Sequence, residues 1–104
     1  MSEHSSIYNV KGELVGRFRN GVGWSSKMER LGEYSNEFVR DNEGNMIAKI
    51  NGNHVLSMSN EELGYVLGKD IFVGNVKAGS YIGLAESASA SIALLFNALG
   101  PHGS

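Results

Sequence analysis

Aromatic and arginine side chains recur at equivalent positions of this chain, and they are the groups best suited to binding chemistry. A flat ring can stack on a sugar or a peptide, and aromatic residues together with arginine are enriched at interfaces. The predicted ligand surface consists of Trp24, Arg17, Arg40, Tyr65 and Phe72. The alternative is structural, since the same side chains are also suited to covering the sheet beneath a helix or in a self-interface.

The other reactive side chains form no catalytic or metal-binding pattern. His54 is expected to be a solvent-facing or packed residue, and Glu61 and Glu62 are expected on opposite faces of a strand. The chain has no cysteine, and no glycine-rich phosphate loop leads into a helix. We therefore expect no enzyme activity, no cofactor and no metal.

Length and charge narrow the class of protein. The 104 residues are enough for one domain, and nine basic against eleven acidic side chains give a net charge of -2. This balance provides no electrostatic reason to expect binding to nucleic acid or to an anionic membrane. No basic segment followed by an apolar run opens the sequence, so we expect a cytoplasmic protein.

A short repeat organises most of the chain. An aliphatic residue followed by a small one recurs at intervals of 16 residues, and a last copy follows after 19. These dipeptides are Val15-Gly16, Leu31-Gly32, Ile47-Ala48, Leu63-Gly64 and Ile82-Gly83. Each unit predicts two short strands and two turns.

The first turn of each unit predicts the pairing of its strands. A two-residue loop of Asn-Gly or Gly-Asn type, as at Asn20-Gly21 and Gly52-Asn53, suits a type I′ hairpin, in which both residues must accept a positive φ. The predicted apolar pairs are Phe18–Gly23, Tyr34–Val39, Ile50–Val55 and Val66–Ile71, and the predicted mixed pairs are Arg17–Trp24, Glu33–Arg40, Lys49–Leu56 and Tyr65–Phe72. Glu37 and Lys69 suit a positive φ poorly, so their loops are expected to differ.

The second turn begins with a polar residue able to bond its own backbone and ends with one that tolerates the left-handed region. Asn9, Ser25, Asp41 and Ser57 begin these turns. Met28 stands where the pattern favours glycine or asparagine, and the sequence offers no reason for it.

The repeat predicts an all-β fold of 16-residue β-hairpin repeats arranged around a pseudo-four-fold axis, with one C-terminal α-helix. In the simplest geometry the hairpins radiate from a centre lined by the small residues. An opening strand near residues 7–8 and a closing strand at 81–84 are expected to pair and complete the ring. This domain spans residues 1–84.

The segment 85–100 predicts an amphipathic helix, with Ser87 as its cap and serines on much of its polar face. Residues 101–104 are expected to be a disordered tail. The apolar stripe covers either the aliphatic residues of the mixed face or a second copy of the chain. Its self-association residues are Ile92, Leu95, Phe96 and Leu99.

The segment 12–18 followed by Asn20-Gly21, and the later segment 38–44, resemble those of bacterial four-fold β-flower domains. The resemblance covers residues 6–84 and implies four hairpin petals about a pseudo-four-fold axis. It implies no activity and no functional residue, and it does not account for the helix.

Two functions remain open from the sequence. The first is a non-enzymatic structural or protein-interaction module that self-associates into a homo-oligomer or binds another protein. The second is a small-ligand or glycan-binding module that uses the aromatic surface around Trp24.

Overall fold

The computed structural model describes residues 4–95 and Leu99, and it consists of ten antiparallel strands closed into a barrel and one helix. The strands are β1 (His4–Asn9), β2 (Leu14–Arg19), β3 (Val22–Ser25), β4 (Arg30–Ser35), β5 (Phe38–Asp41), β6 (Met46–Asn51), β7 (His54–Ser57), β8 (Glu62–Leu67), β9 (Asp70–Val73) and β10 (Val76–Ile82), and the helix is α1 (Ala85–Leu94). The predicted fold class, all-β hairpin repeats with one C-terminal helix, is confirmed.

The predicted strand register is confirmed in all four hairpins. Phe18 lies opposite Gly23 and Arg17 opposite Trp24 in the β2–β3 pair. The corresponding pairs occur in the β4–β5, β6–β7 and β8–β9 hairpins. Because side chains alternate between the two faces of a strand, one set points into the barrel and the other points outward.

The tight loops of the four hairpins fall into two classes. In the loops at 20–21 and 36–37 both central residues have positive φ. Glu37 adopts a φ of 69° despite its side chain, so the expectation that its loop would differ is wrong. In the loops at 52–53 and 68–69 only the glycine at the first position has positive φ. The second pattern is that of a type II′ turn, so the prediction of two positive φ values at residues 52–53 is wrong.

The longer turns are built as the sequence predicts. The polar side chain that begins each turn accepts hydrogen bonds from two backbone N–H groups, at 2.9 to 3.2 Å. Each of these turns closes on a residue with positive φ: Gly12, Met28, Gly44 and Asn60. Met28 therefore holds a left-handed conformation that its neighbours in the repeat reach with glycine or asparagine.

The two ends of the barrel sequence pair with each other, as predicted, with Ile7 opposite Tyr81 in β1 and β10. The closing unit is nevertheless anchored at Gly79 and not at Gly83. A β-carbon at Gly79 would meet the carbonyl oxygen of Tyr8, as one at Gly64 would meet that of Phe72. The last interval is thus 15 residues, and the anchor predicted at Ile82-Gly83 is wrong.

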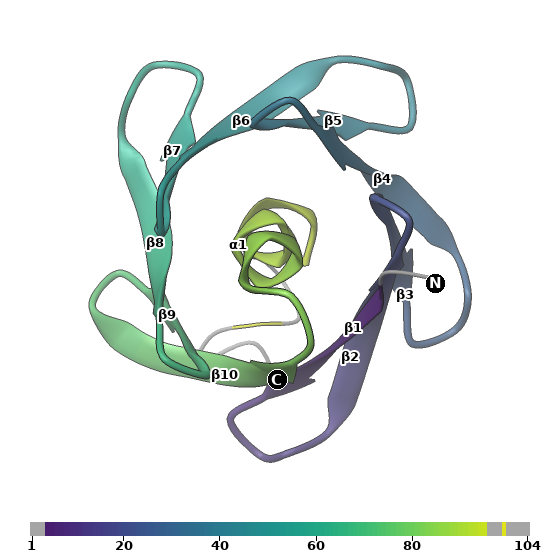
Figure 1. Cartoon of the computed structure of the whole chain (residues 1–104), viewed down its shortest axis with the longest axis vertical. Helices are drawn as coiled ribbons and strands as arrows, with labels where there is room; N and C mark the ends of the chain where they lie inside the picture. The colour runs from purple at the N-terminus through teal and green to yellow at the C-terminus, as the bar shows by residue number, and fades with distance from the viewer. Residues whose placement is uncertain (1–3, 96–98, 100–104) are drawn as a thin grey trace.

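The helix α1 lies inside the barrel, surrounded by the ring of strands (Figure 1). The small residues of the repeat do not meet at a hub. They line the inner wall, where a β-carbon at Gly16 would lie 2.6 Å from Leu95 and one at Gly64 would lie 3.3 Å from Ile92. The helix therefore packs inside its own barrel, in the space that the glycine wall leaves. The aliphatic residues of the repeat are partly buried against the same core: Val15, Leu31, Ile47 and Leu63.

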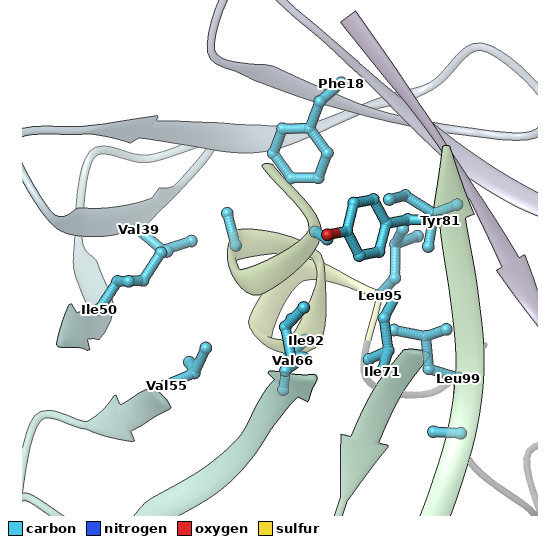
Figure 2. Close-up of a cluster of buried hydrophobic side chains, with 14 of the residues drawn as sticks. Phe18, Val39, Ile50, Val55, Val66, Ile71, Tyr81, Ile92, Leu95 and Leu99 are labelled. Atoms are coloured by element: carbon cyan, nitrogen blue, oxygen red, sulfur yellow. The ribbon is translucent and has the colours of Figure 1, made fainter. Parts of the chain in front are cut away.

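The core is formed between the barrel wall and the helix (Figure 2). Its buried apolar side chains include Ile7, Phe18, Val39, Ile50, Val55, Val66, Ile71, Tyr81, Ile92, Leu95 and Leu99. The middle of the helix is made of small residues that are buried together: Ala88, Ser89, Ala90 and Ser91. Ser89 and Ser91 are buried with the alanines, so they do not form the polar face expected from the sequence.

The chain enters the barrel through a glycine turn after β10. Gly83 has a φ of 128°, and a β-carbon there would lie 2.5 Å from Ser5 Oγ. The Leu84 N–H donates a hydrogen bond to Ser5 Oγ at 2.7 Å. The helix begins directly afterwards at Ala85 with no side-chain cap, so the predicted cap at Ser87 is wrong.

Within the part of the chain that the structure describes, no helix combines the length and the apolar character needed to span a bilayer.

Candidate functional site

A pocket of about 390 Å³ opens on the outer face of strands β1, β2 and β3. It is lined by His4, Ser6, Arg17, Phe18, Arg19, Trp24 and Met28. Two of these residues, Trp24 and Arg17, belong to the ligand surface predicted from the sequence.

Strand register brings the polar residues of the pocket together. Arg17 lies opposite Trp24 of β3 on one side and opposite Ser6 of β1 on the other. Arg19 lies opposite His4 at the next outward-facing level. Residues two apart on a strand share a face, so the arginines of β2 point to the same side of the wall, whereas the Phe18 side chain between them is fully buried in the core.

The lining is electrostatically one-sided. His4, Arg17 and Arg19 are able to carry positive charge, and no carboxylate is among the lining residues. Neither arginine forms an ion pair with any carboxylate of the described residues, whereas Arg30 pairs with Glu33 at 3.4 Å. The pocket therefore combines an indole ring with two guanidinium groups that no described acid neutralises.

Met28 stands at the pocket in a strained backbone conformation. Its φ is 68° and its side chain is 62% exposed. A left-handed φ costs a residue with a β-carbon about 1–2 kcal/mol, and such outliers concentrate at functional sites. The one long turn that closes on an unsuitable residue is thus the turn beside the pocket.

The other predicted surface residues lie elsewhere on the barrel. Tyr65 and Phe72 stack on each other, with ring centroids 5.0 Å apart and planes 7° apart. They belong to β8 and β9, and β10 lies between β9 and the nearest pocket strand, β1. Arg40 lies on β5 opposite Glu33. The five predicted residues therefore lie at three separate positions on the barrel and do not form one surface.

The predicted self-association residues of the helix are not at the surface. Ile92, Leu95 and Leu99 are 0%, 5% and 2% exposed inside their own barrel. Phe96 lies outside the described residues. A free apolar stripe was the reason for placing self-association on the helix, and that reason is removed because the stripe is already covered.

Two titratable groups outside the pocket, His54 and Asp41, have structural partners. The His54 Nδ1 lies 2.5 Å from Glu62 Oε1, and the His54 ring lies 5.8 Å from that of Tyr65. Asp41 begins its turn as predicted. The hydrogen bonds that its carboxylate accepts from the backbone N–H groups of Asn45 and Glu43 lower the pKa of that carboxyl. No group of three or more potential metal ligands occurs among the described residues.

Five lining residues are not part of the ligand surface predicted from the sequence: His4, Ser6, Phe18, Arg19 and Met28. Arg19 could be predicted from the sequence, because it lies two residues after Arg17 and therefore on the same face of the strand. His4 and Ser6 join the pocket through the β1–β2 register, which lies outside the hairpins that the two-residue loops predict.

Comparison with family models, with curated proteins and with solved structures gives no match for this chain.

Proposed function

We propose that this protein is a non-enzymatic binding module that holds a small ligand in the pocket beside Trp24. One observation carries the proposal: a single pocket contains an indole ring and two arginines. No carboxylate of the described residues forms an ion pair with either arginine. Its volume of about 390 Å³ falls within the range of pockets that hold small molecules.

The Trp24 indole is partly exposed to a ligand, and its position on a strand restricts its movement. Trp24 is half-buried on β3, where its strand neighbour is Arg17. An aromatic side chain held in this way offers apolar contact area at a small cost in conformational entropy. This supports binding through the Trp24 ring.

Trp24 is the only tryptophan of the chain, so its fluorescence reports directly on the pocket. The test is a screen of small metabolites and sugars of different charge, monitored by tryptophan fluorescence and repeated by calorimetry. Trp24→Ala is the test variant, measured by calorimetry. Leu56→Ala is the matched control, because Leu56 holds the equivalent position in the β6–β7 hairpin.

The proposal predicts at least one ligand that binds the wild type and the Leu56→Ala variant but not the Trp24→Ala variant. Circular dichroism checks that both variants are folded. Equal binding, or equal absence of binding, in the wild type and in Trp24→Ala contradicts the proposal.

A second candidate function is self-association through the turns. Figure 1 shows the longer turns projecting outward from the barrel. Each of the five turns carries an exposed apolar residue in or next to it: Val10, Met28, Met46, Met58 and Val76. Exposed apolar side chains repeated in this way favour contact with another protein surface.

This candidate predicts a dimer or a larger species by light scattering. Met46→Ser together with Met58→Ser would weaken that species, because these side chains are 45% and 42% exposed and lie away from the Trp24 pocket. A monomer at all concentrations would contradict it.

A further inference from the structure

The Trp24 pocket has a counterpart elsewhere on the barrel. A second pocket, of about 270 Å³, is lined by Glu37, Phe38, Lys49, Ile50, Asn51, Leu56 and Asn60. Subtracting 32, which is two repeats, from six of these positions gives Ser6, Arg17, Phe18, Arg19, Trp24 and Met28, all of which line the first pocket. The repeat therefore produces the same groove at both places, and the two grooves differ in the side chains that line them.

The differences between the two grooves show what the first one is equipped to bind. The first has Trp24 where the second has Leu56, and Arg19 where the second has Asn51. The second also contains an acidic side chain, Glu37, whereas the first contains none. Only the first groove combines a flat ring with an excess of positive charge.

We propose that the Trp24 pocket takes an acidic sugar, a pyranose ring that carries a carboxylate or a phosphate group. This inference rests on the proposed function and adds the chemical class of the ligand. The acidic group lies against Arg17 and Arg19, and the ring lies against Trp24.

The two arginines are arranged to hold an anion. They stand two residues apart on β2, which places their α-carbons roughly 7 Å apart on one face of the strand. A guanidinium group binds a carboxylate or a phosphate through two parallel hydrogen bonds. Because no described carboxylate pairs with Arg17 or Arg19, a bound anion displaces no existing ion pair of the described residues.

The remainder of the lining favours a sugar over a second aromatic ring. Trp24 is the only aromatic side chain on the outer face of the pocket, since Phe18 is buried in the core. The C–H face of a pyranose ring packs on one indole, and Ser6 and His4 offer hydrogen-bonding groups for its hydroxyls. An aromatic ligand would favour a second ring, and the outer lining of the pocket provides none besides Trp24.

Met28 supports the same site from the edge. The equivalent turn residues Gly12, Gly44 and Asn60 suit a positive φ, whereas Met28 brings a long thioether side chain to the pocket. A polarizable side chain adapts to an irregular ligand surface, which is a reason to keep methionine at a strained position.

The test is calorimetry on the full chain with three probes: galacturonate, galactose 6-phosphate and neutral galactose. We expect at least one acidic probe to bind roughly tenfold or more tightly than galactose, since a hydrogen bond to a charged group contributes that much. The carboxylate and phosphate probes distinguish the two sources of the acidic group. Affinity for the acidic probe also falls as salt is added.

Variants locate the charge recognition. Arg17→Gln and Arg19→Gln are each expected to lower the affinity for the acidic probe by roughly tenfold or more. Lys49→Gln is the matched control, because Lys49 holds the Arg17 position in the second groove, and it should leave binding unchanged. Thermal unfolding checks that all three variants are folded.

A transplant provides a gain-of-function test. Lys49→Arg, Asn51→Arg and Leu56→Trp together give the second groove the ring and cations of the first. The expected stoichiometry of the acidic probe rises from one to two per chain.

The outcomes separate this inference from the proposed function. If galactose binds as tightly as the acidic probes and Arg17→Gln has no effect, while Trp24→Ala abolishes binding, the acidic-sugar inference is overturned and the binding module stands. If no ligand is sensitive to Trp24→Ala, both are overturned.

Discussion

Leu95 occupies the space that a side chain at Gly16 would need. A β-carbon at Gly16 would lie 2.6 Å from Leu95 Cδ1, and Leu95 itself is 5% exposed. The same relation joins Gly79 to Leu99, at 2.9 Å. The wall and the C-terminal segment are therefore complementary in volume, with large side chains from the end of α1 and from the residues after it against the glycines of the strands.

Gly64→Ala should destabilise the fold by about 1–3 kcal/mol, the usual cost of an extra methyl group in a packed core. The new β-carbon would lie near the Phe72 carbonyl oxygen, a backbone atom that cannot rotate away. Urea unfolding measures the change. Ala48→Gly is the control, because Ala48 is the equivalent residue that already has a β-carbon, and a stability loss of only about 0.5–1 kcal/mol is expected there. A Gly64→Ala variant as stable as the wild type would contradict this packing.

Met28→Asn should raise the stability by about 1 kcal/mol, because asparagine tolerates the left-handed region better than methionine does. Asn60 holds the equivalent position with a φ of 72°. Thermal unfolding is the measurement. Val10→Asn is the control, since Val10 is an exposed apolar turn residue that is not among the positive-φ residues, and no gain is expected. If Met28→Asn gains nothing over this control, the strain is not real.

Asp41→Ser should reduce the loss of stability in acid. Backbone hydrogen bonds from Asn45 and Glu43 hold the pKa of the Asp41 carboxyl below its ordinary value of 3.8. A lowered folded pKa means that this contribution is present above pH 3.8 and is lost as the pH falls through the folded value. Serine keeps the turn, as at Ser25 and Ser57, but does not titrate.

Urea midpoints measured from pH 6 down to pH 2 provide this comparison. Glu43→Gln is the control, because it removes a neighbouring charge and leaves the Asp41 carboxylate in place. A wild type and an Asp41→Ser variant that lose stability in parallel would refute the role of Asp41.

Tyr34→Phe should flatten the loss of stability in alkali. Burial, followed by the negative charges of Glu86 and Glu37, raises the pKa of the Tyr34 hydroxyl above its ordinary value of 10.0. Above pH 10 the unfolded chain releases this proton first, so the unfolded state binds fewer protons and stability falls as the pH rises. Stability measured from pH 8 to pH 11 tests this, with Tyr65→Phe on the outer face as control. A steeper decline in Tyr34→Phe than in the wild type would contradict it.

The hairpins were predictable because the repeat states the same pairing four times. Pairs such as Phe18–Gly23 and Val66–Ile71 agree with the turn signals and with the alternation of faces, so local rules determine the register. The closing strand was misplaced because its unit is one residue shorter, which moves the anchor from Gly83 to Gly79.

The position of the helix could not be predicted from local pattern. Burial inside the barrel depends on matched volumes between Leu95 and Gly16, which lie far apart in the sequence. An apolar stripe shows that a helix face is covered but does not show by what.

The candidate site was predictable in part. Trp24 and Arg17 follow from the hairpin register, whereas Tyr65 and Phe72 are equivalent to them in the repeat but distant on the ring of strands. Equivalence in a repeat places residues at the same level of different units. It does not bring them together.

The most direct test of the central claim is an NMR titration of the uniformly nitrogen-15-labelled protein with galacturonate and galactose 6-phosphate. The account predicts saturable shifts of the Trp24 indole N–H and of the Ser6, Arg17 and Arg19 backbone amides, with the Lys49, Asn51 and Leu56 amides unmoved. Shifts confined to the second groove, or no shifts at either groove with both ligands, would contradict it.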